Sequence, residues 1–132
     1  PRCADKTGGR AHSRGAPGMI PPHTRIILAT KPVDFRKGPD GLAALVRDAG
    51  GDPFGGALYV FRAKRADRVK IIWWDGTGLC LFAKRLEADR FYWPKLMSGT
   101  IHMSVSQLMA LVEGMDWTRV RSAPQTRPTS VG

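Results

Sequence analysis

Two segments of the chain repeat apolar residues with the period of an amphipathic helix. In the first, leucine, valine and alanine recur at helical spacing behind a proline that suits a first helical turn, and a glycine pair follows. This pattern predicts a helix over residues 39–49. In the second, Ser104 and Gln107 have the spacing of a capping box in front of an apolar stripe. A second helix is therefore predicted over about residues 105–115.

Short runs of β-branched and aromatic residues predict strands. The runs cover residues 25–30, 57–62, 68–74, 79–86, 90–94 and 101–103. The segments DPFGG and DGTG between them have the composition of tight turns. The order of these elements predicts an α+β fold, a single domain in which an antiparallel β-meander is packed by a helix near each end.

The two ends of the chain lack this periodicity. Residues 1–18 hold four cations and one anion without an apolar repeat, and residues 119–132 are polar and contain proline. We therefore predict a disordered basic leader over 1–18, a folded domain over 19–118 and a disordered tail over 119–132. Since Met19 is the first methionine, we interpret the leader as translation ahead of the biological start. The alternative is a basic arm that lies on DNA.

Strand alternation in the central hairpin predicts one apolar face and one mixed face, if Arg62 lies opposite Arg68. The predicted core face is almost wholly apolar and comprises Ala57, Tyr59, Phe61, Val69, Ile71 and Trp73. The predicted outer face mixes cations with apolar residues and comprises Leu58, Val60, Arg62, Arg68, Lys70, Ile72 and Trp74. In this register Trp73 is buried, and Trp74 is more exposed or lies at an interface.

Charge gives the predicted outer face a function. The chain has 132 residues with 21 lysines and arginines against 11 acids, a formal net charge of +10 that is typical of a polyanion-binding protein. Cations of the hairpin would contact phosphates, and Trp74 would stack on an unpaired base. The alternative is a solvated hairpin tip whose lysines block edge-to-edge aggregation. The predicted nucleic-acid or partner contacts are Arg62, Lys64, Arg65, Arg68, Lys70, Trp74, Lys84 and Arg85.

The residues that catalysis or cofactor binding would require do not form a recognisable pattern. The acids are scattered instead of grouped for a two-metal site, and His12, His23 and His102 lack metal-ligand spacing. No glycine motif has dinucleotide or phosphate-loop spacing. We therefore expect no enzymatic activity, metal, cofactor or small-molecule substrate. The apolar runs are too short for a membrane span, and the two cysteines fit a reducing compartment, so we expect a cytoplasmic protein that associates with the nucleoid when active.

Three segments taken together resemble a known protein family. They are VDFRKGPDGLAALV at 33–46, DPFGGALYVFRAKRADRVKIIWWDGTGLCLFAKRLEADRFYWP at 52–94 and SQLMALVEGMDW at 106–117. The linked series FRKG-x-DGL, FR-x-KR-x-D, WWDG, KRLE and FYWP resembles the TnpB or Orf2-like accessory protein of insertion-sequence family sixty-six. The resemblance covers about residues 19–118. Two features depart from the family pattern, namely Pro39 and the leader before Met19.

The resemblance implies a non-catalytic protein that accompanies a separate, larger transposase and supports transposition. The motif residues carry no catalytic role in that family, so none is assigned here. We expect the partners to be DNA, at the ends of the element or without sequence preference, and the transposase of the element. The alternative is a protein-interaction module that stabilises or loads the transposase without contacting DNA.

Overall fold

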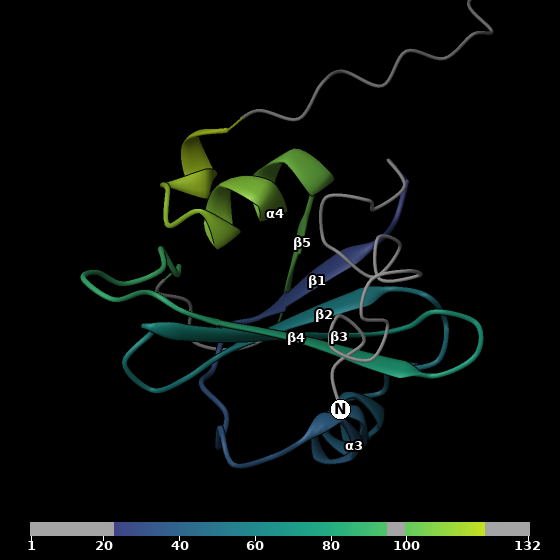
Figure 1. Cartoon of the computed structure of the whole chain (residues 1–132). Coiled ribbons are helices and arrows are strands. Elements are labelled where there is room, and N and C mark those ends of the chain that lie inside the picture. Colours follow the sequence, from purple (N-terminus) through teal and green to yellow (C-terminus); the bar gives the residue numbers. More distant parts are fainter. Residues whose placement is uncertain (1–22, 95–99, 121–132) are drawn as a thin grey trace, which may run out of the picture.

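A computed structural model describes residues 23–94 and 100–120 as a five-stranded sheet with one α-helix on each face (Figure 1). The elements in chain order are β1 (Ile26–Ala29), α3 (Pro39–Asp48), β2 (Leu58–Arg62), β3 (Arg68–Trp74), β4 (Leu79–Arg85), β5 (Thr100–Met103), α4 (Val105–Val112) and the 3₁₀ turn η2 (Trp117–Arg119). The predicted leader and residues 121–132 of the predicted tail lie outside the described residues. The α+β class is confirmed.

The sheet is mixed, with the strand order β4-β3-β2-β1-β5. Strands β2, β3 and β4 form the predicted antiparallel meander. Strand β1 pairs parallel with β2, and α3 makes the connection between them, so the expectation of a wholly antiparallel sheet is corrected. The predicted strand over 90–94 is also wrong. Its residues follow β4 as a loop, which is fastened to β1 because the indole Nε1 of Trp93 donates to the carbonyl of Ala29 over 2.9 Å.

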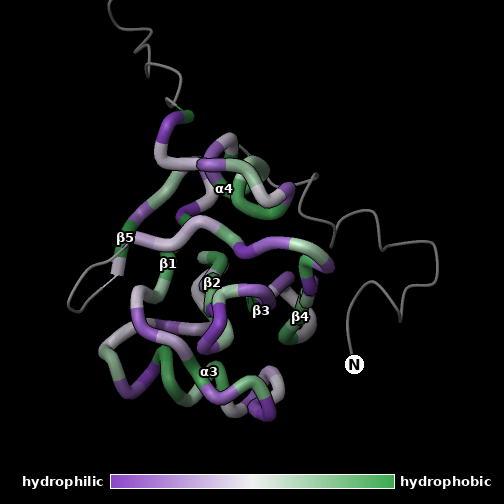
Figure 2. Tube along the Cα trace, turned by 90° about the vertical axis from the view of Figure 1, so that its left-hand side faces the viewer, coloured by the Kyte–Doolittle hydropathy of each residue, from purple (hydrophilic) through white to green (hydrophobic). Residues whose placement is uncertain are grey.

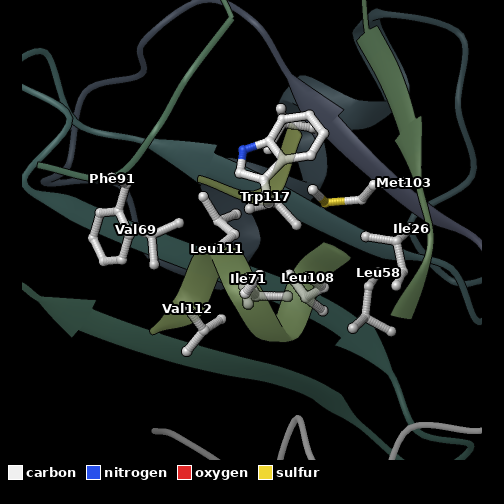
Figure 3. Close-up of a cluster of buried hydrophobic side chains, with 13 residues drawn as sticks. Ile26, Leu58, Val69, Ile71, Phe91, Met103, Leu108, Leu111, Val112 and Trp117 are labelled. Carbon is white, nitrogen blue, oxygen red and sulfur yellow. The ribbon is translucent and has the colours of Figure 1, made fainter. Parts of the chain in front are cut away.

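Both faces of the sheet are covered by apolar side chains, and Figure 2 shows α4 and α3 on opposite sides of the strands. On the α4 side, strand residues pack with Leu108 and Leu111 of the helix and with Trp117 (Figure 3). On the α3 side, Tyr59 and Phe61 pack with Leu42. Strand β2 is apolar at consecutive positions because both faces of the sheet are covered there, so neighbouring residues of the strand are buried.

The predicted register of the central hairpin is wrong by one residue. Arg62 pairs with Val69 instead of Arg68, and Phe61 pairs with Lys70. A one-residue shift moves every side chain of one strand to the opposite face relative to its partner strand. Arg62 therefore lies on the α4 side, whereas Arg68 and Lys70 lie on the α3 side. The predicted single cationic face does not exist.

The two tryptophans of β3 correct the prediction that followed from that register. Trp73 and Trp74 are both partly buried, so the expected contrast of one buried and one exposed ring is absent. Trp73 packs against the core on the α4 side. Trp74 contacts the ring of Phe54, with 5.4 Å between the centroids and 84° between the ring planes. Each face of the sheet thus receives one indole.

The two helices confirm the predicted local signals. Helix α3 begins at Pro39, and α4 begins after the capping box, in which the backbone N–H of Gln107 donates to the Ser104 hydroxyl and that of Ser104 donates to the Gln107 side chain. Helix α4 ends at Val112, three residues before the predicted end. None of the helices in the described ranges is long and apolar enough to cross a membrane.

Candidate nucleic-acid interface

The segment that follows β1 carries the FRKG motif to the tip of the β2–β3 hairpin (Figure 1). The backbone N–H of Val33 donates to the carbonyl of Arg62 over 3.0 Å, which places this segment beside the end of β2. The Lys70 ammonium donates to the carbonyls of Phe35 and Lys37 over 2.7 and 3.0 Å. These hydrogen bonds join the FRKG motif to β3, although the two segments are about thirty residues apart in the chain.

The side chain of Phe35 lies against two cations of β3. The Arg68 guanidinium carbon is 5.3 Å from the ring centroid, and the Lys70 ammonium is 4.7 Å from it. Such cation–π contacts favour this ring position. Burial lowers the pKa of Lys70, and the neighbouring charge of Arg68 lowers it further. The protein therefore holds the like charges of Arg68 and Lys70 close together. The ring of Phe35 lies between the loop and β3 and contacts both cations.

A shallow hollow of about 390 Å³ opens at this junction. Its lining combines apolar groups with charged side chains and consists of Pro32, Val33, Asp34, Phe35, Ala63, Lys64 and Arg68. The cations Lys64 and Arg68 come from the hairpin, and the single carboxylate, Asp34, comes from the opposite loop. The lining of the hollow thus combines apolar residues with two cations and one carboxylate.

Exposed cations surround the hollow, and we call this surface the basic end. The exposed ones are Lys31, Arg36, Lys64, Arg65 and Arg68, and the partly buried Lys37 lies among them. Two carboxylates oppose them. The Asp34 carboxylate accepts a 2.9 Å hydrogen bond from the Arg36 guanidinium, which lowers its pKa to about 2. Asp67 lies 3.9 Å from Arg68. The adjoining loop contributes Glu87, Asp89 and Arg90 next to Arg85 of β4, so the basic end keeps a net positive charge.

Six of the eight predicted contact residues have partners within the fold. Lys70 is bound to the loop carbonyls, and Lys84 donates to the carbonyl of Val112 over 2.8 Å, which joins β4 to the end of α4. Arg62 donates to the carbonyl of Lys64 over 3.2 Å, and Arg85 pairs with Glu87 over 3.4 Å. Trp74, the fifth, packs against Phe54. Arg68, the sixth, lies 3.9 Å from Asp67 and over the ring of Phe35, and it is exposed on the hairpin together with Lys64 and Arg65. Contact of these eight residues with nucleic acid or a partner stays a prediction.

The sequence-based set did not include Lys31, Phe35, Arg36 and Lys37. The signal was present in the FRKG motif, which places an aromatic residue beside two cations just ahead of a helix. The pairing of β1 with β2 brings this motif to the hairpin, and the order of predicted strands did not reveal that pairing. Within residues 23–94 and 100–120, no three histidines, cysteines or acids are grouped so that they could hold a metal ion.

The opposite end of β2 and β3 has a different chemistry, and we call it the aromatic end. Its centre is Phe54, which is 46% exposed, contacts Trp74 and has the Arg47 guanidinium carbon 5.8 Å from its ring centroid. The charged neighbours are mostly acidic. They are Asp48 at the end of α3, Asp52 in the loop before β2 and Asp75 after β3, all exposed.

Comparisons with known proteins match most of the chain. A family model described as IS66 Orf2 like protein matches residues 24–122. An uncharacterized protein of Sinorhizobium fredii (strain NBRC 101917 / NGR234), y4jC, is 51% identical over 108 residues, which cover 81% of this chain and 92% of that protein. A second uncharacterized protein of the same strain, y4hO, is 42% identical over 112 residues, which cover 83% and 95%. No solved structure matches the chain.

Proposed function

The chain belongs to the IS66 Orf2-like family, and from this premise we propose that it supports transposition by binding DNA through its basic end. Membership associates the chain with the transposition of an insertion sequence, in the role of a transposase accessory protein. The proposal adds the ligand and the surface. The ligand is the phosphate backbone of DNA, and the surface is the basic end around Phe35.

The contrast in charge between the two ends of the sheet supports this proposal most strongly. Six cations stand against two carboxylates around the hollow, whereas Arg25 and Arg47 stand against three carboxylates at the aromatic end. Exposed lysines and arginines are the groups that neutralise phosphates and release counterions. Lys64 and Arg65 occupy the hairpin tip, and the side chain of Arg68 is 51% exposed. A polyanion would therefore be attracted to one end of the molecule.

A binding titration with a charge-removing variant tests the proposal. Lys64, Arg65 and Arg68 are replaced together by glutamine, and the affinity for a fluorescent duplex is measured by anisotropy. The triple variant should unfold at nearly the same denaturant concentration as wild type, because exposed substitutions change stability little. Its DNA affinity should fall at least about ten-fold for every sequence tested, since phosphate contacts carry no base information.

Arg47→Gln is the matched control, because it removes one exposed cation from the aromatic end. Its DNA affinity should stay within about two-fold of wild type. Equal loss in the control and in the triple variant would show that only total charge matters and that the basic end is not the contact surface. Unchanged affinity in a folded triple variant would contradict the proposal directly.

The aromatic end supports a second candidate function, which is direct docking onto the transposase. Phe54 is exposed, rests on Trp74 and carries Arg47 over its ring. Aromatic residues and arginine are the side chains most enriched at the energetic centres of protein interfaces. The three acids around them favour a partner surface with positive charge.

A pull-down with the transposase of the element separates the two functions. Phe54→Ala should weaken capture of the transposase in nuclease-treated extract and leave DNA affinity unchanged. The triple glutamine variant should bind DNA more weakly and capture the transposase as well as wild type does. If the triple variant alone loses the transposase without DNA present, the basic end is the protein-docking surface, and the chain is an interaction module.

A further inference from the structure

We propose that the hollow at Phe35 accepts an unpaired base, so that the basic end binds single-stranded DNA by base stacking as well as by phosphate contact. This inference rests on the proposed DNA binding and adds the form of DNA that is recognised. Phosphate binding requires neither Phe35 nor the apolar lining of the hollow, and the inference gives both of them a ligand.

The lining of the hollow supports a base as the occupant. Cations alone suffice to bind phosphate, and Lys64 and Arg68 supply them at one wall. The remaining walls are Pro32, Val33, Phe35 and Ala63, and they offer phosphate nothing. A base has an apolar face that stacks on aromatic side chains and arginine planes, which makes these walls useful only to an unstacked nucleotide.

The charges at the rim orient such a nucleotide. The carboxylate of Asp34 is paired with Arg36, whereas Lys64 and Arg68 are the cations of the lining that attract phosphate. A base that points toward Asp34 can donate an N–H of its Watson–Crick edge, such as the ring N3–H of thymine, to the carboxylate. Phosphate on one side and base on the other is the arrangement of a single strand that lies across the hollow.

The position of Phe35 is fixed before any ligand arrives. Its carbonyl accepts the hydrogen bond from Lys70, and its ring lies near Arg68 and Lys70. A preorganised ring loses little conformational freedom when a base stacks on it. The volume of about 390 Å³ is near the lower limit of ligand pockets.

The test compares three DNA probes of equal length: an oligothymidine strand, an abasic strand that keeps the phosphates, and a duplex. Wild-type protein should bind the oligothymidine about ten-fold or more tightly than the abasic strand, which is the usual contribution of stacking one base. Phe35→Leu should remove that preference while its affinity for the abasic strand and the duplex stays the same. Phe35→Tyr retains an aromatic ring and should retain the preference.

Phe54→Leu is the control at the aromatic end and should leave affinity for all three probes unchanged. The abasic strand also reports on folding, because a Phe35→Leu variant with a disturbed loop would lose affinity for the phosphates as well. If wild type binds the abasic strand as tightly as oligothymidine, or if Phe35→Leu keeps the preference, the base pocket is refuted.

The triple glutamine variant distinguishes failure of the pocket from failure of DNA binding. If it weakens binding of all three probes while Phe35→Leu changes none, DNA binding stands and the pocket fails. If it also changes no affinity, both proposals fail.

Discussion

The two ends of the central strands differ in how they use charged and aromatic residues. At the basic end, Phe35 lies beneath cations and an apolar hollow is surrounded by lysine and arginine. At the aromatic end, the exposed Phe54 contacts the partly buried Trp74, and acids surround this pair. A phenylalanine with a cation over its ring occurs in both places, so that motif alone does not identify a nucleic-acid site. The sign of the surrounding charge makes the distinction.

At the basic end, hydrogen bonds from Lys70 fix the loop that carries Phe35 and Lys37. Removing them is expected to cause the largest change in the free energy of unfolding. Lys70→Met removes the donor that binds the carbonyls of Phe35 and Lys37. The free energy of unfolding should fall by about 2 kcal/mol, because each charge-assisted hydrogen bond contributes on this scale and part of it is recovered by water. Denaturant titration measures the loss. DNA affinity should fall too, although Lys70 itself is partly buried, since the loop that carries Lys37 is released.

Lys64→Met serves as the control for this prediction, because Lys64 is exposed at the hairpin tip. It should change the free energy of unfolding by less than about 0.5 kcal/mol. Equal destabilisation by both variants would mean that Lys70 does not anchor the loop.

A smaller loss of stability is expected at the aromatic end. Trp74→Ala removes a partly buried indole and its edge-to-face contact with Phe54. The expected cost is about 1–2 kcal/mol, which is below the value for a fully buried tryptophan. DNA affinity should not change. If Trp74→Ala binds DNA ten-fold more weakly, DNA contacts the aromatic end, which contradicts binding at the basic end.

The smallest effect concerns acid stability at the basic end. The hydrogen bonds from Arg36 hold the pKa of Asp34 at about 2, below its ordinary value of 3.8. Because the pKa of Asp34 is lower in the folded state than in the unfolded state, its ionised form stabilises the fold at pH values above the ordinary pKa. That stability is lost as the pH falls from about 4 toward 2. Asp34→Asn should therefore flatten the pH dependence of unfolding in this window and leave it unchanged near neutrality. A steeper fall in the variant would contradict the pairing.

Local sequence signals predicted most elements because each rests on residues that are close in the chain. The capping box at Ser104 and Gln107 and the run of β3 at Arg68–Trp74 are examples. The parallel pairing of β1 with β2 has no local signal, since it depends on which strands meet after α3 has crossed the sheet. The segment 90–94 has a strand-like composition, but the Trp93 indole is hydrogen-bonded to a β1 carbonyl in a loop.

The register error has a specific cause in the hairpin turn. Ala63 continues the ladder by donating to the carbonyl of Arg68 over 3.0 Å, which leaves a turn shorter than the assumed AKRAD loop. Ala66 takes the left-handed conformation, with φ of 60°, that glycine or asparagine usually signals. Because residue 66 is alanine, the sequence gives no sign of this tight turn, and the predicted pairing differs from the observed one by one residue. The incorrect register places Arg62 on the same face as Arg68 and Lys70, whereas in the structure the head groups of Arg62 and Lys70 donate to main-chain carbonyls on opposite sides of the sheet.

The salt dependence of duplex binding tests the central claim most directly. The logarithm of the affinity of wild-type protein should fall linearly with the logarithm of salt concentration, by about 0.9 for each phosphate contact. The Lys64, Arg65 and Arg68 glutamine variant should give a slope that is shallower by about 2–3, whereas Arg47→Gln should keep the wild-type slope. A triple variant with the wild-type slope, or an Arg47→Gln variant with an equally reduced one, would show that DNA is not bound at the basic end.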